Sequence, residues 1–239
     1  MLDPARILFE DNHVLAINKA APLLTQAPPQ VPSLEAQVKE YIKSKHAKTG
    51  NVYLGIPHRL DRPVSGVILF ARSTKAAQRI HAQFQQHEVK KVYWAAVEGE
   101  VTPEAGVWDD WVKKLATEAR TVKAEPNEPF AKMATLEYRV LQRFAAGGTL
   151  IEFSPLTGRM HQLRVQGAWR GHPVFGDATY GSTRSFGPPA ELPRDRVVAL
   201  HARRLTFTHP IGKEPMTLEA PLPEYWNALD VDQTQSADV

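Results

Sequence analysis

A carboxylate stands between two arginines in the segment 58–66, whose sequence is HRLDRPVSG. Asp61 is the carboxylate, and Arg59 and Arg62 flank it. Nearby positive charges lower the pKa of a carboxyl group and keep it ionised. A nucleophile, or a group that stabilises a sugar cation, must be ionised in this way. The segment therefore predicts a carboxylate site on a loop, with a functionless surface ion pair as the alternative.

Basic residues also gather at the start of an expected helix, in the segment 157–164 (TGRMHQLR). Gly158 precedes the helix, and free backbone N–H groups at a helix N-terminus bind anions. His161 and Arg164 are three residues apart and share a helix face, and Arg159 adds positive charge nearby. These features favour an anionic ligand, although a solvated helix face has the same pattern.

The segment 90–97 (KKVYWAAV) is typical of a strand. Successive side chains of a strand point to opposite faces, so Lys91 and Tyr93 share one face and Trp94 lies on the other. A cation beside an aromatic ring can hold a phosphate and a base of a nucleic acid. Packing of both rings in the core is the alternative.

Composition excludes several other kinds of site. The 239 residues include no cysteine, so disulfides, thiolate metal sites and cysteine nucleophiles are excluded. The nine histidines form no metal-binding motif, and we expect no metal. The glycine-rich segment 171–181 is interpreted as structural.

The chain is mildly basic, with a net charge of +3 and a pI of about 9.1. This balance is compatible with a polyanionic partner without requiring one. We see no signal peptide and no apolar run of the ~18–20 residues that a membrane helix needs. The expected location is the cytoplasm.

Short apolar runs and turn residues predict many strands and three helices. Strands are expected at residues 6–9, 14–17, 67–71, 92–97, 136–144, 149–153, 197–200, 205–208 and 216–218, and helices at 33–46, from 73 or 74 onwards, and at 161–169. Between residues 101 and 130, short strand-like pieces alternate with polar loops. The pattern predicts an α+β fold with a mixed, largely antiparallel sheet. We expect a single domain over residues 1–239, with a core at about 5–226 and a frayed tail after Trp226.

Taken in order, these segments resemble the RluA-type family of pseudouridine synthases over most of the chain. The segments that carry the resemblance are 14–19, 58–66, 91–99, 158–164, 171–177, 200–202 and 220–223. Each is weak alone, but the ordered set is specific. The resemblance implies the catalytic fold of that family, without the separate N-terminal RNA-binding domain that some relatives carry.

The family resemblance also implies a reaction, the isomerisation of uridine in ribosomal or transfer RNA without a cofactor. Asp61 matches the catalytic carboxylate, which attacks C1′ or assists deprotonation at C2′. Tyr93 matches a tyrosine that packs on the base, and Arg164 matches the basic partner of the carboxylate. Arg59 matches an arginine that fills the space left by the flipped nucleotide. The other expected substrate-binding residues are His58, Arg62, Lys91, Arg159 and His161.

Two positions depart from the family pattern. Val64 stands where a threonine is common, and Ala20 and Ala21 replace part of a Lys-Pro-x-Gly motif. We expect a monomer without an obligate protein partner, which contacts RNA phosphates through its own basic surface. Candidates for these contacts are Lys43, Lys45, Lys48, Lys90, Lys91, Lys113 and Lys114.

Two other functions are alternatives to the isomerisation of uridine. An RNA-binding protein without turnover would not need Asp61, Tyr93 and Arg164 together. A glycosidase acting on a free nucleoside would need a second acid. Glu98, Glu100 and Asp177 are not evidently placed for that role.

Overall fold

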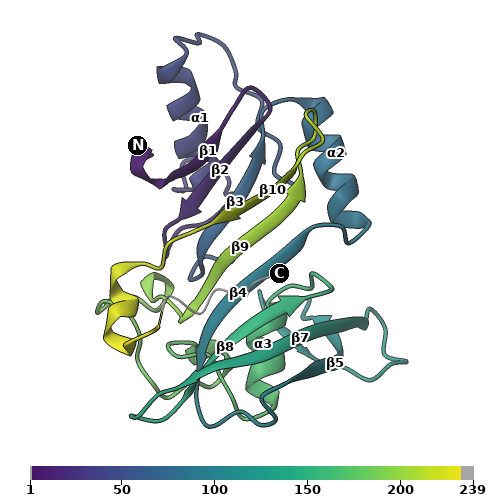
Figure 1. Cartoon of the computed structure of the whole chain (residues 1–239), viewed down its shortest axis with the longest axis vertical. Coiled ribbons are helices and arrows are strands. Elements are labelled where there is room, and N and C mark those ends of the chain that lie inside the picture. The colour runs from purple at the N-terminus through teal and green to yellow at the C-terminus, as the bar shows by residue number, and fades with distance from the viewer. Residues whose placement is uncertain (1, 233–239) are drawn as a thin grey trace. The chain divides into compact units, whose positions relative to one another are not determined.

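The computed structural model describes residues 2–232, which divide into two compact units. Unit 1 contains residues 2–91 and 202–222, and unit 2 contains residues 92–201 and 223–232. The chain passes between the units three times, within β4 (Lys90–Val97), within β9 (Leu200–Thr208) and between Leu222 and Pro223. Figure 1 shows both strands.

Unit 1 is built on strands in the order β1-β2-β3-β9-β10. The N-terminal hairpin and its neighbour pair antiparallel, with Val14 opposite Ala71 and Lys19 opposite Gly66. All seven residues of β3 are buried, as expected for a central strand of mostly apolar sequence. The remaining strands of this unit are β1 (Ile7–Glu10), β2 (Val14–Lys19), β3 (Ser65–Ala71) and β10 (Pro215–Glu219).

Two serines start the helices of unit 1, as the sequence predicts. The side chain of Ser33 accepts a hydrogen bond from the backbone N–H of Ala36 at the start of α1 (Leu34–Lys45). Ser73 does the same for α2 (Thr74–Gln85). Each helix turns apolar residues inward, such as Ile42 in α1. A short 3-10 helix, η1 (Pro4–Arg6), precedes the first strand.

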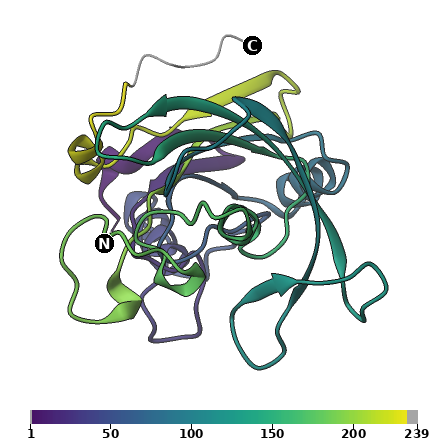
Figure 2. The same cartoon turned by 90° about the horizontal axis from the view of Figure 1, so that it is seen from below.

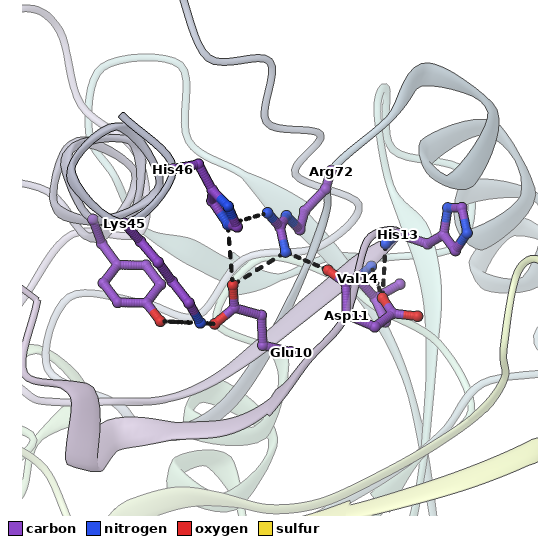
Figure 3. Close-up of polar contacts among 8 residues, drawn as sticks. Glu10, Asp11, His13, Val14, Lys45, His46 and Arg72 are labelled. Carbon is purple, nitrogen blue, oxygen red and sulfur yellow. Dashed lines mark hydrogen bonds and ion pairs between the residues drawn. The ribbon is translucent and has the colours of Figure 1, made fainter. Parts of the chain in front are cut away.

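Polar contacts attach α1 to the first hairpin (Figure 3). The carboxylate of Glu10 accepts hydrogen bonds from Tyr41 at 2.7 Å, from Lys45 at 2.7 Å and from Arg72 at 3.1 Å. The neighbouring Asp11 accepts from two backbone N–H groups of the turn, each at 2.7 Å. Helix, hairpin and the end of β3 are therefore joined at one point of unit 1.

Unit 2 holds an antiparallel set of strands in the order β4-β8-β7-β5-β6. Figure 2 shows β5, β6 and β7 as a teal ribbon and α3 in green. Its remaining elements are β5 (Ala105–Lys114), β6 (Thr121–Lys123), β7 (Lys132–Arg143), β8 (Thr149–Pro155), α3 (Gln162–Trp169) and the short helices η2 (Ala178–Tyr180), η3 (Pro193–Asp195) and η4 (Glu224–Leu229).

The predicted fold class is confirmed, but three local predictions differ from the structure. After residue 101 strands and loops alternate as predicted, with the short β6 as one such piece, but β5 runs unbroken for ten residues. The second is the strand at 197–200, because β9 begins only at Leu200. Backbone hydrogen bonds connect Ala199 to two different segments, at Phe175 and Ala96, so no single ladder forms there.

The third concerns the tail. Residues 224–229 form η4 with Trp226 fully buried, and Gln142 bonds to the backbone of Asp230 and Asp232. The expected fraying is therefore wrong as far as residue 232, and residues 233–239 lie outside the described part. No helix among the described residues is long and apolar enough to cross a membrane.

Candidate active site

The loop that carries Asp61 is fixed on both sides by buried polar contacts within unit 1. The hydroxyl of Thr25 donates to the carbonyl of Leu60 at 2.9 Å and accepts from the N–H of the same residue at 3.1 Å. On the far side of Asp61, the N–H of Val64 donates to the Asp61 carbonyl at 3.1 Å. A loop held in this way keeps its carboxylate in one position.

A buried lysine lies beneath this loop. Lys19 ends β2 and has no exposed surface. Its ammonium group donates to the carbonyls of Ala20, Leu23 and Arg62, at 3.1, 2.7 and 3.3 Å. Burial lowers the pKa of Lys19 to about 7, against an opposing rise caused by the Asp61 carboxylate. Lys19 thus joins two loops and adds to the electrostatic environment of Asp61.

His58 braces the loop from the side of β3. Its Nε2 accepts the N–H of Leu69 at 2.9 Å, and its ring stacks on Phe84 with the centroids 4.8 Å apart. Burial and the charge of Lys91 lower the pKa of His58 to about 3, so the ring is neutral. This environment gives His58 a structural role, and its direct contact with substrate stays a prediction.

The exit of the loop into β3 requires a glycine. Gly66 has a φ of 118°, and a Cβ atom built there would lie 2.3 Å from the carbonyl oxygen of Ala202. The preceding Val64 is only 2% exposed, so a valine side chain suits this apolar position. Arg59, the arginine that precedes Asp61 in the loop, is exposed in unit 1, as expected for a residue that contacts substrate.

Strand β4 places its aromatic residues as the alternation predicts. Trp94 is 1% exposed, and its indole N–H donates to Glu152 at 3.3 Å. Tyr93, opposite Phe153 of β8, lies on the other face and is half-buried. Burial lowers the pKa of Lys91, the residue two positions before Tyr93.

In unit 2, Arg164 projects from α3 into a buried ion pair. Its Nε donates to Asp177 at 2.6 Å and one terminal nitrogen donates to the second carboxylate oxygen at 2.8 Å. Both side chains are at most 5% exposed. A bidentate pair of this kind fixes the plane of the guanidinium. The predicted contact between Arg164 and Asp61 stays a prediction.

Tyr180 joins this pair to its surroundings. The guanidinium of Arg164 lies 5.0 Å from the centre of the Tyr180 ring. The Tyr180 hydroxyl lies 2.9 Å from Nδ1 of His161 and accepts the N–H of Thr121 at 3.0 Å. His161 has a φ of 52°, which is uncommon for a residue other than glycine. Its ring is therefore held by Tyr180 at the start of α3, and substrate contact stays a prediction.

The segment before α3 is closed by a side chain of the helix. The Gln162 carboxamide oxygen accepts from the N–H of Arg159 at 3.0 Å and from the Thr157 hydroxyl at 2.8 Å. The side chain of Arg159 donates to the backbone carbonyl of Met133 at 2.8 Å. Arg159 is consequently anchored against the start of β7.

Three residues that support the candidate side chains were not predicted from the sequence: Lys19 in unit 1, and Asp177 and Tyr180 in unit 2. Lys19 belongs to the segment 14–19, whose pattern indicates a strand and the family resemblance but no site. Asp177 and Tyr180 belong to the glycine-rich segment 171–181, which was interpreted as structural. A buried arginine needs an acid, and this rule could have directed a search to Asp177. No cluster of three potential metal-ligating side chains occurs in the described part of the chain.

Known proteins resemble this chain over most of its length. A family model described as RNA pseudouridylate synthase matches residues 13–169. The RluA dual-specificity RNA pseudouridine synthase of Escherichia coli K12 is 34% identical over 220 residues, which are 90% of this chain and 92% of that protein. The ribosomal large subunit pseudouridine synthase C of Rickettsia bellii is 29% identical, over 93% of this chain and 70% of that one.

Solved structures show the same likeness. Human RNA pseudouridylate synthase domain containing 4 has a TM-score of 0.77 and 25% identity, with 96% of this chain and 94% of that chain covered. The chain therefore belongs to the RNA pseudouridine synthase family, whose members are isomerases. Within that family it is of the RluA type. The chain spans 65% to 70% of the synthase C relatives, but more than nine-tenths of the RluA relatives.

Proposed function

We propose that this protein converts specific uridines of ribosomal or transfer RNA to pseudouridine, with Asp61 as its catalytic carboxylate. The observation that carries the proposal is the fixed loop of Asp61, held by Thr25, Lys19 and His58, in a chain of this family. The bacterial relatives described above include, by name, both a large ribosomal subunit enzyme and a dual-specificity RNA enzyme.

The proposed reaction needs no net change in composition. The bond between C1′ and N1 of uridine breaks, after attack of Asp61 on C1′ or deprotonation at C2′. The freed uracil turns, and C5 forms the new bond to C1′. This step releases the Asp61 carboxylate from C1′ on the first route, and it is accompanied by return of the proton to C2′ on the second. The proton on C5 then leaves, with Tyr93 as the proposed base, and N1 gains a proton. We propose that neither metal nor cofactor takes part.

The target nucleotide must leave its stack before a side chain can reach the sugar–base bond. Arg59, exposed beside the Asp61 loop, is the proposed occupant of the vacated space. Arg164 is the proposed partner of Asp61, and Arg62, Lys91, Arg159, His58 and His161 are proposed to contact or support the substrate. We further propose a single catalytic domain over about residues 5–226, acting as a monomer in the cytoplasm.

Pseudouridine mapping in cells tests the proposal and finds the target. Carbodiimide-dependent stops of reverse transcription are compared in total RNA from cells with and without the gene. We expect one or more stops in ribosomal or transfer RNA to vanish on deletion. They should return with the wild-type protein and not with Asp61→Asn. Unchanged stops in both RNA classes would contradict the proposal.

A further inference from the structure

Three lysines share one face at the end of the ribbon formed by β5, β6 and β7. Lys123 of β6 and Lys132 of β7 both lie opposite Val112 of β5. Directly opposed residues of a sheet point to the same side, and so does Lys114, two residues beyond Val112. All three lysines are exposed, and none forms an ion pair within the described residues. Gathered like charges repel one another unless an anion binds between them.

An exposed aromatic residue lies close in the chain to Lys132. Phe130, two residues before Lys132, is 88% exposed. No other exposed large apolar residue in the described part of the chain has so high an exposed fraction. Its φ of 65° is uncommon for a bulky residue. A ring in this position contributes almost nothing to the core, so packing does not explain it.

The turn that carries Phe130 is fixed by Glu128. Its carboxylate accepts the backbone N–H of Glu125 at 2.8 Å and pairs with Lys113 of β5. Its carbonyl accepts the N–H of Ala131 at 3.1 Å. Phe130 therefore lies in a closed turn attached to the ribbon, and the carboxylate of Glu128 in that turn is paired with Lys113.

This end of the ribbon connects to the segment before α3. The side chain of Arg159 bonds to the carbonyl of Met133, which follows Lys132 directly. Met133 is itself 38% exposed. The strand that carries Lys132 is thus bonded, through the backbone of the next residue, to a residue predicted to bind substrate.

We propose that Lys114, Lys123, Phe130 and Lys132, called here the ribbon grip, bind an unpaired stretch of the RNA substrate. The lysines contact phosphates and Phe130 stacks on a base, the combination by which single strands are held without sequence readout. RNA is favoured over a protein partner because three exposed lysines and an exposed ring are complementary to a phosphate backbone and its bases. The inference rests on the proposed function for its choice of RNA.

Binding is measured on the full chain carrying Asp61→Asn, by fluorescence anisotropy with a labelled oligouridine of about 20 nucleotides. Phe130→Ala should raise the Kd about tenfold, whereas Phe130→Tyr should keep it within about twofold. Neither Phe130 variant should change the salt dependence of the Kd, because neither substitution removes a charge. Val107→Ala, an exposed apolar residue of the same ribbon, is the matched control and should bind normally.

The lysines are tested by the slope of log Kd against log salt concentration. Lys123→Ala with Lys132→Ala should lower that slope by about 1.4, because each phosphate contact on a single strand contributes about 0.7. Lys75→Ala, an exposed lysine of α2, should leave the slope unchanged.

An unchanged Kd for Phe130→Ala, or an unchanged slope for the double lysine variant, overturns the ribbon grip. A Phe130→Ala variant that loses self-association in sedimentation while binding RNA normally also overturns it, in favour of contact between copies. Since the chain tested is catalytically inactive by design, these results are independent of turnover. Failure of the proposed function would instead appear as absent turnover in the wild type.

Discussion

At the scale of single residues, the buried ion pair of Arg164 and Asp177 is expected to have the largest effect on the stability of the fold. Both groups of the pair are removed from water and satisfied by two hydrogen bonds. Removing the carboxylate charge of Asp177 takes from the buried Arg164 guanidinium the group that accepts both of these hydrogen bonds, which is costly away from water. We expect Asp177→Asn to lower the free energy of unfolding by about 3 kcal/mol, as measured by urea denaturation.

The control for this prediction is an exposed ion pair. Arg143 contacts Glu100 and Glu104 on the surface, where water and salt screen the attraction. Arg143→Ala should therefore have nearly the same free energy of unfolding in urea as the wild type. A loss for Asp177→Asn no larger than that for Arg143→Ala would show that the buried pair does not stabilise the fold.

His58 predicts a pH dependence of stability. Its pKa is about 3 in the folded protein and near 6.5 when unfolded, so the unfolded chain takes up the proton first. The stabilisation is complete above pH 6.5 and is lost as the pH falls toward 3. Between pH 7 and about pH 5 the wild type should lose up to about 2 kcal/mol more than His58→Gln, measured by urea denaturation. Equal losses would refute the buried, neutral histidine.

Only part of the site could be predicted at this scale. Asp61 and its arginines form a contiguous segment, so their charge pattern is visible in the sequence. Asp177 follows Arg164 by 13 residues through a loop, and no periodicity connects the two. Lys19 resembles any surface lysine at a strand end until the carbonyls that surround it are located.

At the scale of elements, Gly66 determines whether β3 can follow the Asp61 loop. An alanine there would place its Cβ 2.3 Å from the Ala202 carbonyl, at a φ of 118°. Both the contact and the backbone conformation are unfavourable for any residue with a side chain. We expect Gly66→Ala to destabilise the protein by at least about 3 kcal/mol, or to yield no soluble protein.

Gly50→Ala serves as the comparison, because a Cβ atom at Gly50 would meet nothing within 4 Å. That variant should stay within about 0.5 kcal/mol of the wild type in urea. Similar free energies of unfolding for the two variants would show that β3 and β9 can separate enough to admit a methyl group at Gly66.

Elements with strong local signals were predictable from the sequence. The two capped helices and the hairpin of β7 and β8 follow from serine caps and the Gly147-Gly148 turn. Strand β5 was missed as one element because charged residues such as Asp109 interrupt its apolar positions. Residues 197–199 are apolar and buried without forming a strand, which shows that composition alone does not specify hydrogen-bond partners.

At the scale of the whole molecule, the family match spans residues 13–169 and thus parts of both units. Asp61 lies in unit 1, whereas Tyr93 and Arg164 lie in unit 2. The proposed chemistry therefore draws on both units. Each unit contributes its own support, with Lys19 buried and His58 partly buried in the first unit, and Asp177 and Tyr180 buried in the second.

The most direct measurement is tritium release from ribosomal and transfer RNA transcripts made with uridine tritiated at C5. Bond formation at C5 expels the tritium into water, so release counts conversions. We expect release by the wild type without free uracil, and a loss of several orders of magnitude for Asp61→Asn with RNA binding retained. Near-normal release by Asp61→Asn would contradict the role of Asp61, and free uracil would indicate hydrolysis instead of isomerisation.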